Sequence, residues 1–268
     1  MRSCKFRGGA ARVTAALAIV TIAAIAFASC GGPYRAKKTN QPGEKLAAAD
    51  ALFGRGKYGD AAIEYKDFLQ TFAGDERSDY AQFRAAEAYR MDKEYALAAV
   101  EYRIITVDFG YSEYVDDAMF LEALCAFKQS PRVERDQTKT YEALNGVNRF
   151  LQVFPSSPRA EEARLLLRDV QEKLGKKEFL NARLYFRKKR YTAALVHFDK
   201  IMDLYPATTW ASRSHYYRGY IRETRGDATG AASEYRETAA SGGAFDEKAE
   251  AEKRLKLIEG SAVKPKGS

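Results

Sequence analysis

The stretch "GKYGDAAIEYKDFLQTF", residues 56–72, decides the fold. In it Ala61 is followed four and seven positions later by the aromatic residues Tyr65 and Phe68. Residues with this spacing lie on one face of an α-helix. The small alanine lets the helix approach a partner closely, and the aromatic residue one turn later fills the space beside it. We therefore predict a helix whose buried face combines small and aromatic residues.

The same spacing recurs along the chain. It is centred on five alanines, which are Ala61, Ala98, Ala143, Ala194 and Ala231. We call these alanines the anchors of their units. In four of the five units, a small residue lies twelve positions before the anchor. This spacing predicts a preceding helix that packs against the helix that carries the anchor. Five helical hairpins with this spacing are the tetratricopeptide (TPR) pattern, whose units stack into a right-handed superhelix with a concave groove. The fold class expected is therefore an all-α TPR solenoid of about five repeats with a C-terminal capping helix. An ordinary helical bundle with alanine seams is the alternative.

The anchor spacings set the expected boundaries. The third unit carries about eight extra residues around Pro131, which predict an exposed loop near 128–140. One long helix is expected from about Pro158 to Lys188, kinked near Gly175. The predicted segments are a signal peptide at 1–29, a tether at 30–43, a solenoid at 44–260 and a disordered tail at 261–268. Within the solenoid, the repeats are expected near 44–73, 80–110, 116–155, 158–206 and 210–243, followed by a cap at 244–260.

The first thirty residues resemble a bacterial lipoprotein signal. Residues 13–27 form an apolar run of 15 residues behind a basic N-terminus, and a spanning helix would need roughly 20. The run ends in Phe27-Ala28-Ser29-Cys30, which is similar to a lipobox except for the phenylalanine in place of the usual leucine. We expect cleavage before Cys30 and acylation of that cysteine, which would hold the protein on a membrane without crossing it. A plain signal or a membrane anchor with an incidental cysteine is the alternative.

Composition narrows the possible functions. The net charge of +8 includes four signal cations, so the chain after residue 29 is near +4. A mildly basic exported protein gives no reason to expect nucleic-acid binding. If Cys30 is lipidated, Cys125 has no disulfide partner and is expected to be a small core residue.

No catalytic or metal-binding constellation is recognisable. His197 and His215 stand on predicted repeat helices without a ligand cluster at the required spacing, and no phosphate-binding glycine loop or HExxH motif is present. The run "RKKR" at 187–190 is expected to be a solvated turn, with contact to lipid headgroups or an acidic partner as the alternative. We therefore expect a binding protein without enzymatic activity, and no cofactor apart from the lipid on Cys30.

The groove of such a solenoid is lined by the first helix of each hairpin. Offsets from Ala49, Ala86 and Ala123 give the candidate groove residues Leu46, Asp50, Phe53, Tyr80, Phe83, Glu87, Arg90, Met91, Phe120, Leu124, Phe127 and Lys128. Aromatic residues interleaved with Arg90 and Lys128 suit an extended peptide that has apolar side chains and a carboxylate. The alternative is that these aromatic residues pack between repeats.

The combination of lipobox, tether and five repeats with an extended fourth unit resembles the BamD family of outer-membrane β-barrel assembly lipoproteins. Three stretches carry the resemblance: "GKYGDAAIEYKDFLQTF", "SPRVERDQTKTYEALNGVNRFLQVFPSSPRAEEARLL" and "KKEFLNARLYFRKKRYTAALVHFDKIMDLYP". It covers residues 44–206 well and the last unit less well.

The resemblance implies a lipid-anchored protein on the periplasmic face of the outer membrane. Its partners would be the central barrel insertase, other members of the complex and unfolded barrel clients. The groove of units one to three would receive the clients, and the later units would hold the insertase. The alternatives are another periplasmic TPR lipoprotein, such as a cell-wall or division coordinator or a secretion pilotin, and, less favoured, a glycan-binding lipoprotein.

Overall fold

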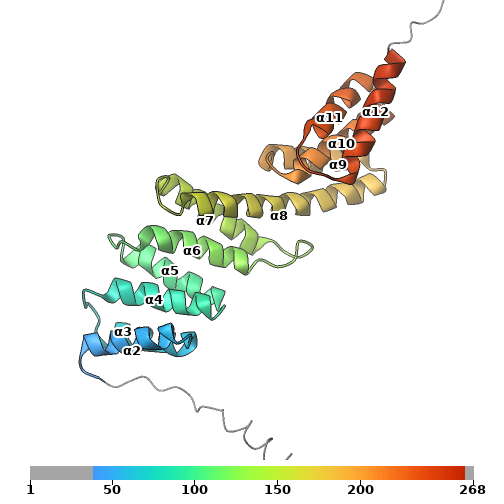
Figure 1. The fold of residues 1–268 in the computed structure, drawn as a ribbon. Helices are drawn as coiled ribbons and strands as arrows, with labels where there is room; N and C mark the ends of the chain where they lie inside the picture. Colours follow the sequence, from blue (N-terminus) through green and yellow to red (C-terminus); the bar gives the residue numbers. More distant parts are fainter. Residues whose placement is uncertain (1–38, 263–268) are drawn as a thin grey trace, which may run out of the picture.

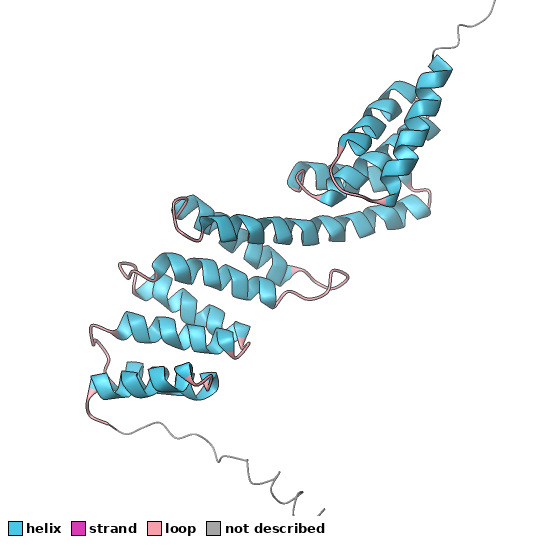
Figure 2. Cartoon of the chain, in the orientation of Figure 1, coloured by secondary structure: helices cyan, strands magenta, loops and turns pink. Residues whose placement is uncertain are grey.

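The structure is a computed structural model that describes residues 39–262. Figure 1 shows helices stacked in chain order, and Figure 2 shows helices joined by short loops in this part of the chain. The helices are α2 (Pro42–Gly54), α3 (Tyr58–Thr71), α4 (Ser78–Met91), α5 (Tyr95–Asp108), α6 (Val115–Lys128), α7 (Thr138–Val153), α8 (Ala160–Arg187), α9 (Tyr191–Leu204), α10 (Thr209–Thr224), α11 (Ala228–Ala240) and α12 (Asp246–Ala262). The prediction of an all-α solenoid of helical hairpins is confirmed.

The segment boundaries differ from the predicted ones at both ends. The helix α2 begins at Pro42, inside the predicted tether, because proline is well suited to the first turn of a helix, where its missing N–H is not needed. The helix α12 extends to Ala262, two residues into the predicted tail. The predicted signal peptide and Cys30 lie outside the described residues. Within 39–262, no helix is both long and apolar enough to span a membrane.

The anchor residues form the contact between the two helices of each hairpin. All five anchor alanines are fully buried. The residues four positions later are also fully buried, namely Tyr65, Tyr102, Val147, Phe198 and Tyr235. The spacing identified from the sequence therefore marks the buried face of the second helix in every repeat.

A polar contact joins the two helices of four hairpins at equivalent positions. Three residues after the anchor, the second helix carries a side chain that pairs with one 19 residues earlier on the first helix. The pairs are Lys45–Glu64 at 2.5 Å, Gln82–Glu101 at 2.5 Å, Glu178–His197 at 3.0 Å and His215–Glu234 at 2.7 Å. The two histidines thus join the helices of their hairpins by pairing with glutamates. The third hairpin has Gly146 at this position, and a Cβ there would lie 2.9 Å from the Cβ of Ala123.

The long helix α8 connects two cores. Its first half, including Leu166 and Leu174, packs into the cluster built by α5, α6 and α7. Its second half, including Phe179 and Ala182, packs into the cluster built with α9 and α10. The helix runs unbroken through Gly175, and Figure 1 shows no sharp bend in it. The glycine has a packing role instead of the expected kink.

Gly175 makes room for the start of α10. A Cβ at this position would lie 3.3 Å from the Thr208 side chain and 3.3 Å from the Trp210 ring. The hydroxyl of Thr208 caps α10 by accepting from the Ala211 N–H. The missing side chain therefore lets the first turn of the fifth repeat lie directly against α8.

Candidate peptide-binding groove

The first helices of repeats one and two border a groove at the N-terminal end of the solenoid. A pocket of about 600 Å³ lies between α2, the first turn of α4 and the loop before α6. Its lining includes Asp50, Tyr80 and Tyr114, with Leu46 on α2. Asp50 lies on α2 and Tyr80 on α4, and the two side chains face each other. The pocket is therefore formed where the first repeat stacks on the second.

Asp50 is the polar centre of this groove. Its Oδ1 accepts hydrogen bonds from the hydroxyls of Tyr65 at 2.5 Å and Tyr80 at 2.8 Å. Burial and the hydrogen bond to Asp50 raise the pKa of Tyr80 to about 12, and the same causes raise the pKa of Tyr65 above its ordinary value. Both phenols therefore stay protonated and act as donors, which fixes the orientation of the Asp50 carboxylate.

Arg84 lies on α4 beside the groove, and Arg77 is the arginine that lines the pocket itself. The Arg84 guanidinium lies over the Phe53 ring, 3.8 Å from the centroid. Its Nε is buried and has no hydrogen-bond partner among the described residues, and it lies 3.9 Å from Asp50. A stacked guanidinium with an unused donor is suited to bind a carboxylate, because its planar fork matches the two oxygens.

Aromatic rings extend the groove beside Arg84. Phe83 stacks on Tyr114, with centroids 4.7 Å apart and planes 16° apart. Tyr80 also contacts Tyr114, with centroids 6.4 Å apart. Further along α4, the Arg90 guanidinium donates to the Glu87 carboxylate at 2.7 Å. The charge of Arg90 is therefore partly neutralised within its own helix. Met91, the last residue of α4, is exposed.

The prediction that Phe120 lines the groove is wrong. Phe120 is fully buried, and its ring contacts Phe150 with centroids 5.7 Å apart. The Arg159 guanidinium covers it at 5.5 Å from the ring centroid. The side chain therefore belongs to the core of the third repeat.

The other third-repeat candidates stand apart from the Asp50 centre. Phe127, on α6, is partly buried against the hydrophobic core that α6 shares with its neighbouring helices, and the Lys173 ammonium lies 5.5 Å from its ring centroid. Lys128 is exposed at the end of α6. The structure thus brings together Phe53, Tyr80 and Phe83 on the first two repeats. Phe127 and Lys128 lie one hairpin further along the solenoid.

Two groove residues were missed by the sequence reasoning. Arg84 follows Tyr80 by four positions and precedes Glu87 by three, so helical spacing alone could have included it. Tyr114 lies in the loop before α6, where no periodicity applies, and only the three-dimensional stacking on Phe83 identifies it. Within 39–262, no group of three or more His, Cys, Asp or Glu residues could hold a metal ion.

Comparison with known proteins gives a family. Residues 40–259 match the family described as YfiO, outer membrane lipoprotein. A protein from Caulobacter vibrioides, named outer membrane protein assembly factor BamD, is 29% identical over 202 residues, which cover 71% of this chain and 65% of the relative. A protein of the same name from Rickettsia prowazekii is 25% identical over 173 residues, covering 62% of this chain and 66% of the relative. The chain thus spans just under two thirds of each relative's length.

Solved structures with similar repeats are more distant. The TPR domain of P58(IPK) has 18% identity and a TM-score of 0.39, covering 82% of this chain and 55% of that one. A tetratricopeptide repeat protein from Parabacteroides merdae has 13% identity and a TM-score of 0.26, covering 81% and 98%. Scores this low add nothing to the fold argument, which rests on the helices themselves. The family match covers most of the chain and agrees with the repeat spacing, so this protein belongs to the YfiO family of outer membrane lipoproteins and is BamD-like.

Proposed function

We propose that the chain is a non-enzymatic scaffold of an outer-membrane β-barrel assembly complex. In this proposal it is anchored through a lipid on Cys30 to the periplasmic face of the outer membrane. It docks on the barrel insertase, contacts the other members of the complex and binds unfolded barrel clients. The name of the two relatives, outer membrane protein assembly factor BamD, supports the process, and the family description supports the membrane.

The groove of the first repeats supports client binding. Its rings, Phe53, Phe83 and Tyr114, offer apolar surface to an extended segment, and Arg84 offers an unused donor to a terminal carboxylate. The single observation that carries the proposal is the Arg84 guanidinium stacked on Phe53, whose Nε has no hydrogen-bond partner among the described residues. A barrel client whose last residue is aromatic presents both the ring and the carboxylate that this site can bind.

The later repeats are proposed to hold the insertase. The second half of α8 forms a separate core with α9 and α10, so those repeats can keep a partner without changing the groove. Figure 1 shows α8 carrying the chain from the first stack of hairpins to the last helices. This spacing allows one partner to remain bound while clients enter and leave.

A client-peptide titration tests the groove. The ligand is a ten-residue C-terminal peptide of an outer-membrane barrel that ends in phenylalanine, compared with the same peptide amidated at its C-terminus. Changing Arg84→Gln should weaken binding of the free-acid peptide by about tenfold or more, since hydrogen bonds to charged groups contribute roughly 1.5–3 kcal/mol. Phe83→Ala combined with Arg90→Gln should also weaken it.

The controls separate the groove from general charge effects. Arg187→Gln removes an exposed arginine at the end of α8 and should leave the affinity unchanged. The amidated peptide should bind the unmodified chain and Arg84→Gln equally weakly. Equal affinity of the free-acid peptide for the unmodified chain and for Arg84→Gln would refute carboxylate capture by this residue.

A further inference from the structure

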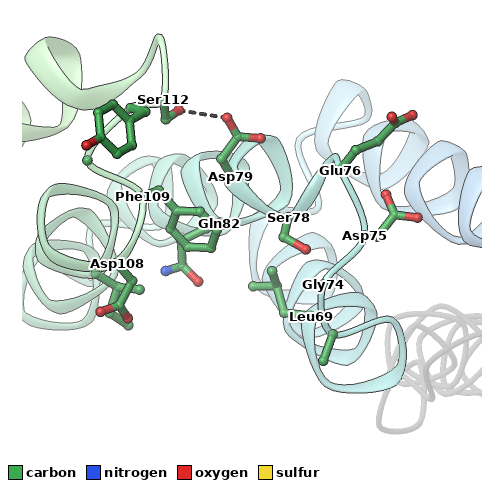
Figure 3. A pocket seen from close by; sticks show the side chains of 14 residues that line it. Leu69, Gly74, Asp75, Glu76, Ser78, Asp79, Gln82, Asp108, Phe109 and Ser112 are labelled. Atoms are coloured by element: carbon green, nitrogen blue, oxygen red, sulfur yellow. Dashed lines mark hydrogen bonds between the residues drawn. The ribbon is translucent and has the colours of Figure 1, made fainter.

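A second cavity lies at the edge of the solenoid, where the connection between α3 and α4 meets the connection between α5 and α6 (Figure 3). Its volume is about 720 Å³. Glu76 and Asp79 border both this cavity and the end of the groove, whereas Ile104, Phe109 and Tyr111 border only this one. The cavity therefore lies on the other side of the first turn of α4 from the groove.

The lining of this cavity is acidic. It contains the carboxylates of Asp75, Glu76, Asp79 and Asp108 and no lysine, arginine or histidine, in a chain whose net charge is +8. The local charge is therefore opposite to that of the whole molecule. Such a lining disfavours anionic ligands, including lipid headgroups and nucleic acids, and favours a cation.

Two of the carboxylates are already used within the fold. Asp75 binds the Arg77 guanidinium through both oxygens, at 2.8 and 2.9 Å. Asp79 accepts from the Ser112 hydroxyl at 2.7 Å (Figure 3). The Asp108 carboxylate makes no hydrogen bond and no ion pair with any residue of the described part of the chain. Its charge is therefore available to a ligand.

Ser78 gives an independent indication of a ligand. Only 8% of the residue is exposed, and its Oγ has no hydrogen-bond partner among the described residues. The residue is one of those that line the cavity (Figure 3). The first residue of the corresponding helix is Val115 in the third repeat and Ala160 in the fourth. The fold therefore accepts an apolar residue here, and the unpaired hydroxyl is not needed for folding.

Apolar groups lie next to the carboxylates. Leu69, Ile104 and Phe109 line the cavity, and the Tyr111 side chain at its rim is fully exposed. Val107, one position before Asp108, is 71% exposed. An apolar wall beside an acidic pocket matches a side chain that has a methylene stem and a positive end. Exposed aromatic residues at such a rim are typical of protein contact surfaces.

We propose that this cavity binds an arginine side chain of a partner protein. The stem would lie against Leu69, Ile104 and Phe109. The guanidinium would donate to the Asp108 carboxylate and to the Ser78 hydroxyl, which can accept. Arginine fits better than lysine because its planar fork can reach both acceptors at once. The site is separate from the proposed client groove and does not depend on that function.

The test uses a small probe on the full-length chain in detergent micelles. Nα-acetyl-arginine methylamide is titrated while the backbone amide signals of Gly74, Gly110 and Ser112 are followed by NMR. The matched probe is Nα-acetyl-citrulline methylamide, which has the same shape without the charge. We expect saturable shifts with the arginine probe and about tenfold weaker binding of the citrulline probe.

Three variants locate the effect. Asp108→Asn should weaken arginine binding about tenfold, and Ser78→Ala about fivefold, with amide signals outside the cavity unchanged. Asp203→Asn removes an exposed carboxylate on α9 and should have no effect. The absence of saturable shifts, equal binding of the citrulline probe, or unchanged affinity in Asp108→Asn would each overturn the proposal.

Discussion

Phe198 provides the most demanding test of the repeat geometry. It lies four positions after the anchor Ala194 and is fully buried. Its ring stacks on Tyr217, with centroids 5.4 Å apart and planes 10° apart, and contacts Phe179 edge-on at 5.9 Å. The side chain thus joins three helices, α8, α9 and α10. We expect Phe198→Ala to lower the free energy of unfolding by roughly 3–5 kcal/mol, because apolar burial is lost and a cavity remains.

The assay is urea unfolding of the chain without residues 1–29, followed by circular dichroism and by the emission of Trp210, the only tryptophan. Val196→Ala is the control, because Val196 lies on the same helix but is 64% exposed. It should change stability by about 0.5 kcal/mol or less. A loss of less than about 1 kcal/mol in Phe198→Ala would refute the claim that this position holds the hairpins together.

Three further predictions concern other parts of the fold. Burial alone would raise the pKa of Glu178, but hydrogen bonds from Lys200 and His197 outweigh it and hold the pKa below its usual 4.5. The stability from this carboxylate is present above that value and is lost as the pH falls below it, so Trp210 emission should shift to longer wavelength on acidification; an unchanged spectrum would contradict this. Burial raises the pKa of Cys125 to about 12, so a chain starting at residue 31 should show no reactive thiol when native and one in denaturant. A thiol that reacts in the native chain would contradict it. Gly219→Ala should lower stability by roughly 1–3 kcal/mol in the same urea assay, although alanine favours helices, because its Cβ would lie 2.7 Å from the buried Tyr235 ring. Unchanged stability would mean that the ring can move aside.

The sequence was sufficient for the repeat architecture because the repeats are periodic. A small residue and a large one, spaced by helical turns, can only be buried together if the helix packs on its neighbour. That is why Ala98, Tyr102 and Ile105 are all fully buried, as their spacing predicts. The extra residues around Pro131 form a loop that is mostly exposed, as expected, although Gln137 is buried and donates to backbone carbonyls within the loop.

The groove could be predicted only in part. Phe83 and Phe120 occupy equivalent positions three residues before the small residue of their helices, so periodicity cannot separate them. Phe120 is covered by Phe150 and by Arg159, whereas Phe83 keeps part of its ring accessible beside Tyr114. The difference arises partly from Phe150 on α7 of the same repeat and partly from the residue just before the next repeat, which is Arg159 beside Phe120 and Tyr114 beside Phe83.

Arg84 shows a second limit of the sequence. A single arginine on a helix is usually a solvated side chain, and the spacing of Arg84 from Tyr80 and Glu87 places it on their face of α4 without giving it a role. Its role follows from the Phe53 ring beneath the guanidinium and from the buried Nε, and both depend on how α2 and α4 pack. Asp50, by contrast, was a candidate from its offset and does lie at the polar centre of the groove.

The most direct test of the proposed role is a quantitative purification from native membranes. The tagged full-length protein is extracted in mild detergent, and the proteins that remain bound are identified and counted by mass spectrometry. We predict recovery of a large barrel protein with repeated periplasmic domains, in nearly equal amount to the tagged chain. Recovery of cell-wall enzymes or of a secretion ring, with no such barrel protein, would contradict the assembly role and favour another periplasmic TPR lipoprotein.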